Sequence, residues 1–148
     1  MAKRRSKKIN VVPGDVFIVP LADGTQGVAQ VIEVIAELAA ALCAFYAYRV
    51  NAQAVAAATF DFARADIVTV TPMSLLALVS GEWPILHNAP VAHADLSRKL
   101  DPLRASGYVG LVMANAKAMA SLMNAHHGLG PWEIGTDRDF LRRLVSRP

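Results

Sequence analysis

Two apolar runs near the start of the chain flank an Asp-Gly step. Val16 to Val19 form the first run, Val28 to Ile35 form most of the second, and Asp23-Gly24 lies between them. Asp-Gly tolerates the positive φ angles of a tight turn, and β-branched and aromatic residues suit a pleated surface. The pattern therefore predicts a β-hairpin over residues 13–31, with strands over residues 11–21 and 27–35.

Residues 31–44 fit two structures. Glu33, Glu37 and many alanines favour a helix from about residue 33 to residue 44. Four β-branched residues within five positions favour a strand instead, namely Val31, Ile32, Val34 and Ile35. We favour two strands with a turn near Glu37.

The middle of the chain contains shorter patterns. Residues 51–58 are alanine-rich and predict a short helix or a loop, and residues 87–104 predict a loop. Strands are predicted over residues 65–70, 83–86 and 108–113. Thr71-Pro72 predicts the start of a short helix, with Thr71 as its N-cap, that ends at Gly81.

Two helices are predicted near the C-terminus. Residues 116–126 show an apolar face followed by Gly128, and at the start of residues 136–145 Thr136 and Asp139 resemble a capping box. The elements together predict an α+β fold. It is a small, mostly antiparallel β-sheet or partly open barrel that starts with the N-terminal hairpin. It carries two or three short helices, two of them near the C-terminus, in a single domain over residues 11–148.

Positive charge is concentrated at the N-terminus. Five of the 15 basic side chains lie in the first eight residues, which leaves 10 against 12 acidic side chains in the rest. We therefore expect residues 1–10 to be a disordered basic tail. The longest uncharged apolar stretch, residues 38–48, is too short to span a bilayer, and no secretory signal follows the basic residues. With a single cysteine, the chain is expected to be cytoplasmic and to have no membrane partner.

No catalytic constellation, metal site or cofactor motif is apparent in the sequence, and we expect none. The histidines His87, His93, His126 and His127 lack the spacing of a zinc site. Cys43 lies in an apolar run that predicts a buried, unreactive thiol. The methionines Met113, Met119 and Met123 are interpreted as core residues. For Trp83 and Trp132, packing is favoured over a role at an interface.

Three segments resemble the immunity protein 26 family of bacterial toxin-immunity systems. They are G-D-V-F-x-x-P-L-x-D-G-x-x-G-V-A-Q-V at residues 14–31, G-x-W-P-I-L-x-x-A-P-V at residues 81–91, and L-G-P-W-E-I-G-T-D-R-D-F-L-R-R-L at residues 129–144. The resemblance implies a mostly β fold with added helices. It also implies that the protein binds and neutralises a cognate protein toxin without catalysis.

One acidic and aromatic cluster is a candidate for such binding. Trp132 and Glu133 are followed closely by Asp137 and Asp139. Because many toxins that act on nucleic acids are basic, acidic side chains beside a tryptophan suit an inhibitor. We take these four residues as the predicted partner-binding site, with the oligomeric state left open.

The alternative is a small SH3-like module that binds nucleic acid through the basic tail. A third possibility, a small hydrolase, would need residues distant in sequence, such as His87 and Asp101, to meet.

The nucleic-acid alternative makes a direct prediction. Binding to DNA or RNA would be steeply weakened by salt and would disappear when residues 1–8 are deleted, because those residues supply the cations that contact phosphates. A filter-binding titration at several salt concentrations checks this. No binding above background at low salt would exclude the alternative.

Overall fold

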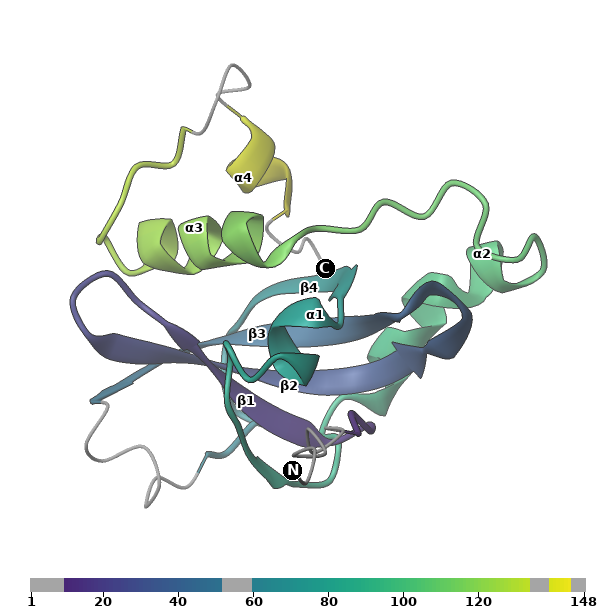
Figure 1. Cartoon of the computed structure of the whole chain (residues 1–148), viewed down its shortest axis with the longest axis horizontal. Coiled ribbons are helices and arrows are strands. Elements are labelled where there is room, and N and C mark those ends of the chain that lie inside the picture. The colour runs from purple at the N-terminus through teal and green to yellow at the C-terminus, as the bar shows by residue number, and fades with distance from the viewer. Residues whose placement is uncertain (1–9, 52–59, 134–138, 145–148) are drawn as a thin grey trace, which may run out of the picture.

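A five-stranded antiparallel sheet forms the centre of the computed structural model, which describes residues 10–51, 60–133 and 139–144 (Figure 1). The strand order is β4-β3-β2-β1-β5, so β4 and β5 form opposite edges of an open sheet. The strands are β1 (Asp15–Pro20), β2 (Thr25–Ile35), β3 (Ala40–Asn51), β4 (Ile67–Ser74) and β5 (Ile85–Asn88). The helical elements are η1 (Ala36–Leu38), α1 (Leu76–Val79), η3 (Ala94–Leu100), α2 (Asp101–Arg104), α3 (Ala116–His126) and α4 (Phe140–Leu144). The predicted α+β fold is confirmed.

The predicted hairpin is formed by β1 and β2. Ile18 pairs with Val28 in its middle, and Gly24 has a φ of 85° in the turn. The Asp23 side chain accepts a hydrogen bond from the backbone N–H of Thr25 at 3.0 Å. The Asp-Gly step therefore directs the turn as the sequence indicates.

The ambiguous residues 31–44 form strands. β2 ends at Ile35, η1 makes the turn around Glu37, and β3 starts at Ala40 after Ala39 adopts a left-handed φ of 48°. From Ala40 to Tyr46, β3 is buried on both faces, so its apolar residues run without alternation. Burial between two strands outweighs the helix propensity of its alanines.

Each face of the sheet carries its own core. On one face, Phe17, Val31 and Phe45 pack with residues of α1, α3 and α4, including Leu78, Met119, Leu122, Met123 and Leu141. On the other face, Val28, Leu42 and Tyr46 pack with Phe62 and Leu100, the latter at the end of η3. Figure 1 shows α3 and α4 together on one side of the sheet.

Trp83 is a packing residue, as predicted. It is buried, and its ring stacks on Phe17 with a centroid separation of 6.0 Å and an interplanar angle of 14°. Phe45 meets the same ring edge-on at 6.4 Å. These contacts join β1 and β3 to the segment between α1 and β5.

The predicted helix start at Thr71-Pro72 is wrong. Both residues lie inside β4, where Thr71 pairs with Cys43, and α1 begins only at Leu76. A proline is tolerated because β4 is an edge strand, and the Pro72 carbonyl accepts a hydrogen bond from Ala114 at 2.9 Å. Gly81, with a φ of 79°, follows α1 as expected.

The predicted strand over residues 108–113 is also wrong. Tyr108 has a φ of 67° and Gly110 a φ of 89°, which break an extended conformation, and only Ala114 forms an isolated bridge, to Met73. Met113 is exposed, whereas Met119 and Met123 are core residues as predicted. Residues 87–104, predicted as a loop, contain part of β5 and the short helices η3 and α2.

The two C-terminal helices are present. Asn115 caps α3 by accepting a hydrogen bond from the Ala118 N–H at 2.8 Å, and Gly128 follows its end with a φ of 73°. α4 begins at Phe140, and the predicted N-cap Thr136 lies outside the described residues.

A polar junction ties the turn before β1 to its neighbours. The buried Asp15 carboxylate accepts hydrogen bonds from the Val12 N–H and from the Asn88 side chain, both at 3.0 Å. The buried Gln30 amide donates to the carbonyls of Gly14 and Ala89 at 3.2 and 3.1 Å. β1, β2 and the end of β5 are thus held at one point.

Gly14 is required at that junction. It has a φ of 93°, and a Cβ there would lie 2.5 Å from the Ala89 carbonyl oxygen. We expect Gly14→Ala to lower the free energy of unfolding by about 3 kcal/mol or more, through backbone strain and overpacking. Urea denaturation measures the change.

Gly24→Ala is the matched control. Gly24 also has a positive φ, of 85°, but a Cβ there meets nothing within 4 Å. We expect Gly24→Ala to lower the free energy of unfolding by only about 1 kcal/mol, the cost of placing a side chain at a positive φ. An equal decrease in the free energy of unfolding in the two variants would contradict the role of the close approach between Gly14 and the Ala89 carbonyl.

Candidate protein-binding surface

Three of the four predicted partner-binding residues come together around one arginine. The Arg142 guanidinium lies 5.6 Å from the centroid of the Trp132 ring. Its two terminal nitrogens lie 3.6 Å from a Glu133 oxygen and 3.9 Å from an Asp139 oxygen. Asp137 lies outside the described residues. We name Trp132, Glu133, Asp139 and Arg142 the C-terminal surface.

The local sequence explains this arrangement. Gly128 ends α3, and Pro131 precedes Trp132 in a segment that turns away from the helix. Leu141 is fully buried in the core and holds α4 in place. Trp132 itself is half-buried and packs against the same core. Both sides of the surface are therefore fixed by the body of the fold.

Arg142 changes the electrostatics that the sequence predicts. It places a positive charge between two carboxylates and stacks on the indole, a favourable cation–π geometry. Exposed ion pairs of this kind stabilise a fold little. Their effect here is to orient the side chains. The i,i+3 spacing to Asp139 on the predicted helix was a usable signal for that pair, whereas nothing in the sequence linked Arg142 to Trp132.

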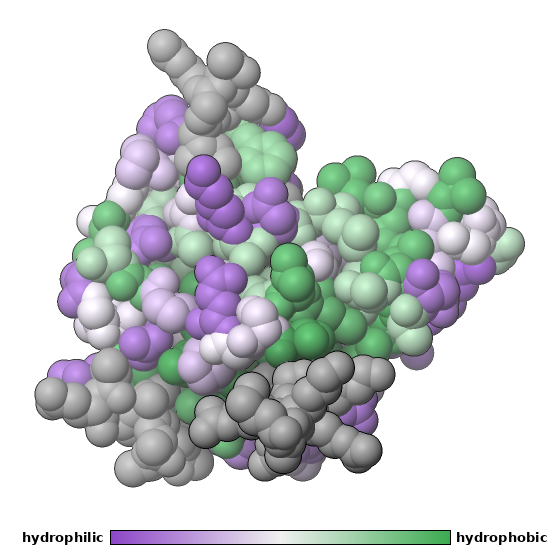
Figure 2. Space-filling view, in the orientation of Figure 1, coloured by the Kyte–Doolittle hydropathy of each residue, from purple (hydrophilic) through white to green (hydrophobic). Residues whose placement is uncertain are grey.

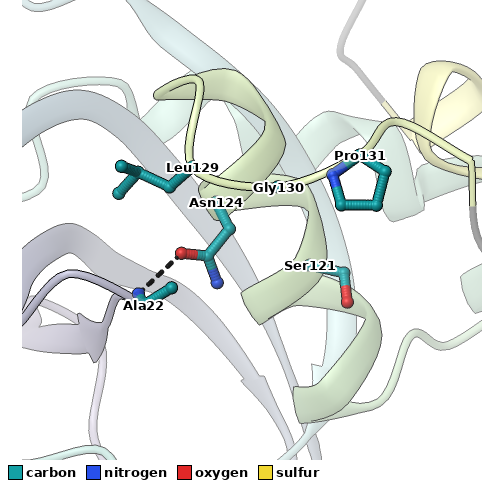
Figure 3. A pocket seen from close by; sticks show the side chains of 6 residues that line it. All are labelled: Ala22, Ser121, Asn124, Leu129, Gly130 and Pro131. Atoms are coloured by element: carbon teal, nitrogen blue, oxygen red, sulfur yellow. Dashed lines mark hydrogen bonds between the residues drawn. The ribbon is translucent and has the colours of Figure 1, made fainter.

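A shallow pocket of about 240 Å³ lies beside this surface (Figure 3). It is lined by Ala22, Ser121, Asn124, Leu129, Gly130 and Pro131, the last of which adjoins Trp132 in the chain. The Asn124 side chain accepts a hydrogen bond from the Ala22 N–H at 2.8 Å and donates one to the Ala120 carbonyl at 2.9 Å. Asn124 therefore joins the hairpin turn to α3 and shapes one wall.

Charged residues gather at the tip of the hairpin. Arg49 forms an ion pair with Asp23 and donates a hydrogen bond to the Thr25 hydroxyl at 3.1 Å. Hydrogen bonds from Thr25, followed by the contribution of Arg49, lower the pKa of Asp23 to about 2. The Asp23 carboxylate is therefore ionised over the physiological pH range, and Arg49 balances its charge.

His127 is the C-cap of α3, which agrees with its predicted position at a helix end. Its Nε2 is buried and has no hydrogen-bond partner in the part of the chain that the structure describes. Burial lowers the pKa of His127, and the nearby His126 and Arg49 lower it further. The neutral ring is therefore favoured in the fold.

The remaining titratable groups that the sequence singled out, and Tyr46, are either packed in the fold or exposed to solvent. Burial raises the pKa of the Cys43 thiol, as predicted for an unreactive cysteine, and raises the pKa of Tyr46 to about 12. His93 contacts the Phe62 carbonyl at 2.8 Å, and His87 is exposed on β5. Among residues 10–51, 60–133 and 139–144, no three His, Cys, Asp or Glu side chains are grouped to hold a metal ion. Within the same ranges, no helix has the length and apolarity to cross a membrane.

A second surface of interest is apolar. Leu76, Val109 and Val112 are exposed by 73%, 75% and 76%, and Val79 and Met113 are also exposed. We name these five residues the arm patch, because residues 105–113 form an arm between α2 and α3 (Figure 1). In Figure 2, hydrophobic surface extends from the region of α1 to this arm. The sequence does not indicate the patch, because residues 108–113 have the pattern of a strand.

Comparisons of the chain with protein-family models, with curated proteins and with solved structures found no match. The resemblance to the immunity protein 26 family therefore stays a prediction from the sequence motifs.

His127 makes stability depend on pH. Because its pKa is lower in the fold than the ordinary value of 6.5, its contribution to stability is complete above that value and is lost as the pH falls below it. Urea denaturation between about pH 7.5 and pH 5 measures the loss. His127→Gln, which cannot be protonated, is expected to reduce it.

His87→Gln is the control, since His87 is exposed on β5. It is expected to keep the wild-type pH dependence. A loss of stability that is the same in the wild type and in His127→Gln would contradict this account.

Proposed function

We propose that this protein is a non-catalytic immunity protein that binds and neutralises a cognate bacterial toxin, and that it does so through the C-terminal surface. The observation that carries the proposal is the Trp132 indole held under Arg142, with Glu133 and Asp139 on either side of the guanidinium. The proposal involves no chemical step by this chain.

Residue type supports this surface. Tryptophan and arginine are the residues most enriched among those that contribute strongly to binding at protein interfaces. Trp132 is already packed on one side, and Arg142 is oriented by its three neighbours. Such side chains lose little conformational entropy when a partner binds, which favours affinity.

Charge supports a basic partner. Glu133 and Asp139 are each at least half exposed and outnumber the single Arg142 between them. A basic toxin surface would find two carboxylates already in place. The adjoining pocket of about 240 Å³ offers room for one side chain of the partner.

The motifs that carry the family resemblance serve the fold. Gly14 allows a close backbone approach, Asp15 joins β1 to Asn88, and Trp83 fills the core between Phe17 and Phe45. This structural role of the motif residues agrees with an immunity protein in which the residues shared with the family specify the scaffold. The residues that select a toxin would then lie on its surface.

We further propose that the protein acts in the cytoplasm. The single cysteine, Cys43, is a buried free thiol, which fits a reducing compartment.

Binding to the protein that the neighbouring open reading frame encodes tests the proposal. Calorimetric titration should show a complex with the wild type, and Trp132→Ala should weaken it about 30-fold, because it removes a central side chain worth about 2 kcal/mol. Unchanged affinity in Trp132→Ala would remove the C-terminal surface from the proposal. No complex with the wild type would overturn the proposed function.

Charge reversal provides a second test with a matched control. Asp139→Lys is expected to weaken the complex about 10-fold or more, since it sets like charges opposite each other. Asp61→Lys is the control, because Asp61 pairs with Arg64 at 3.8 Å in the same i,i+3 geometry that Asp139 and Arg142 show at 3.9 Å. A variant that reverses both Asp137 and Asp139 but binds as tightly as the wild type would contradict an electrostatic role.

A further inference from the structure

Leu76 of the arm patch lines a pocket that has opposite charges on its rim. The pocket, of about 290 Å³, is lined by Ser74, Leu76, Ala77, Glu82, Asn115, Ala116 and Lys117. Glu82 follows α1, whereas Lys117 lies in the first turn of α3. Neither side chain forms an ion pair within the described residues, and both are exposed. The pocket thus combines an apolar wall with one acidic and one basic group from different elements.

The arm beside this pocket is held at both ends. At its start, Arg104 donates hydrogen bonds to both Glu33 oxygens at 2.6 and 2.8 Å, which fixes α2 to β2. At its end, the Ala114 N–H donates to the Pro72 carbonyl at 2.9 Å. Val109 and Val112 are therefore exposed on a segment anchored to the sheet at either side. A fixed apolar surface of this kind is typical of an interaction site.

We propose that the arm patch binds a second copy of this chain, in a twofold dimer whose axis passes close to the pocket. A twofold interface uses the same surface of both copies, and each contact between two different residues occurs twice. The surface must therefore be complementary to itself. Glu82 and Lys117 meet that requirement, because each finds the opposite charge on the partner copy.

The shape of the patch meets the same requirement. Leu76 is exposed by 73% and stands at the edge of a hollow that it helps to line. In a twofold arrangement, Leu76 of each copy enters the pocket of the other and is removed from water. Met113 precedes the pocket residues Asn115 and Ala116 by only a few positions and extends the apolar contact toward the arm.

The charges distinguish a second copy from the toxin. A basic toxin would favour carboxylates and would be repelled by Lys117, whereas a second copy uses both signs. The five exposed side chains make a small patch, since a standard interface has about 20 to 30 residues on each side. The dimer is therefore expected to be weak, with a dissociation constant in the micromolar range.

Sedimentation equilibrium of the full chain tests the proposal without any partner. Between about 1 µM and about 1 mM, the wild type is expected to pass from monomer to dimer. Glu82→Lys and Lys117→Glu, tested singly, are each expected to weaken the dimer about 10-fold or more, because like charges then face each other twice. The double variant exchanges the charges and is expected to restore the wild-type dissociation constant.

Leu76→Ser tests the apolar contact, and Val12→Ser is its control. Leu76 is solvent-exposed, so its replacement leaves the core intact, and we expect the dimer to weaken about 10-fold or more. Val12, exposed by 39% in the segment before β1, lies outside the arm patch, and its replacement is expected to leave the dimer unchanged.

Three results would overturn the proposal. The first is a wild-type chain that stays monomeric at the highest concentration. The second is a dimer that neither the charge reversals nor Leu76→Ser affects. The third is a double variant that fails to recover the dimer while it remains folded. Because toxin binding is measured separately, failure of the dimer leaves the proposed function standing, and failure of toxin binding leaves the dimer standing.

Discussion

The close backbone approach at Gly14 is the constraint on which the rest of the structure depends. A side chain there would meet the Ala89 carbonyl at 2.5 Å, and the same turn brings Asp15 to Asn88 and Gly14 to Gln30. Because these contacts fix β5 beside β1, Trp83 is directed onto Phe17 in the core between them. α3 then packs closely over Gly27, where a Cβ would meet the Met123 side chain at 2.9 Å. The segment that carries Trp132 follows one end of α3, and the arm of residues 105–113 precedes the other end.

Much of the fold could be predicted from the sequence at positions where the residue type strongly favours one local structure. Asp23-Gly24 predicts its turn, and the β-branched residues around Val34 outweigh the nearby alanines. The two wrong predictions share a cause, because in each segment the local sequence pattern is overridden by the tertiary structure. Thr71-Pro72 is a good helix start in isolation, yet its place at an edge strand depends on Ala114, more than 40 positions away. Residues 108–113 resemble a strand, but Tyr108 and Gly110 adopt positive φ angles and leave Val112 exposed.

The candidate site was partly accessible to sequence reasoning. Trp132, Glu133 and Asp139 are close in the chain, so their proximity follows from spacing. The Asp139–Arg142 pair follows from its i,i+3 spacing, whereas the contacts of Arg142 with Trp132 and Glu133 depend on tertiary structure. The arm patch was inaccessible, because the exposure of Leu76 and Val112 depends on tertiary structure. The two surfaces differ in chemistry: one is polar with an aromatic centre, and the other is apolar with balanced charges.

Hydrogen exchange in the complex with the proposed toxin partner tests the central claim most directly. The account predicts that the toxin slows amide exchange in residues 128–133 and 139–144, around Trp132 and Arg142, and leaves exchange in residues 105–113 unchanged. Protection confined to the arm, or a complex that protects neither region, would contradict the assignment of toxin binding to the C-terminal surface.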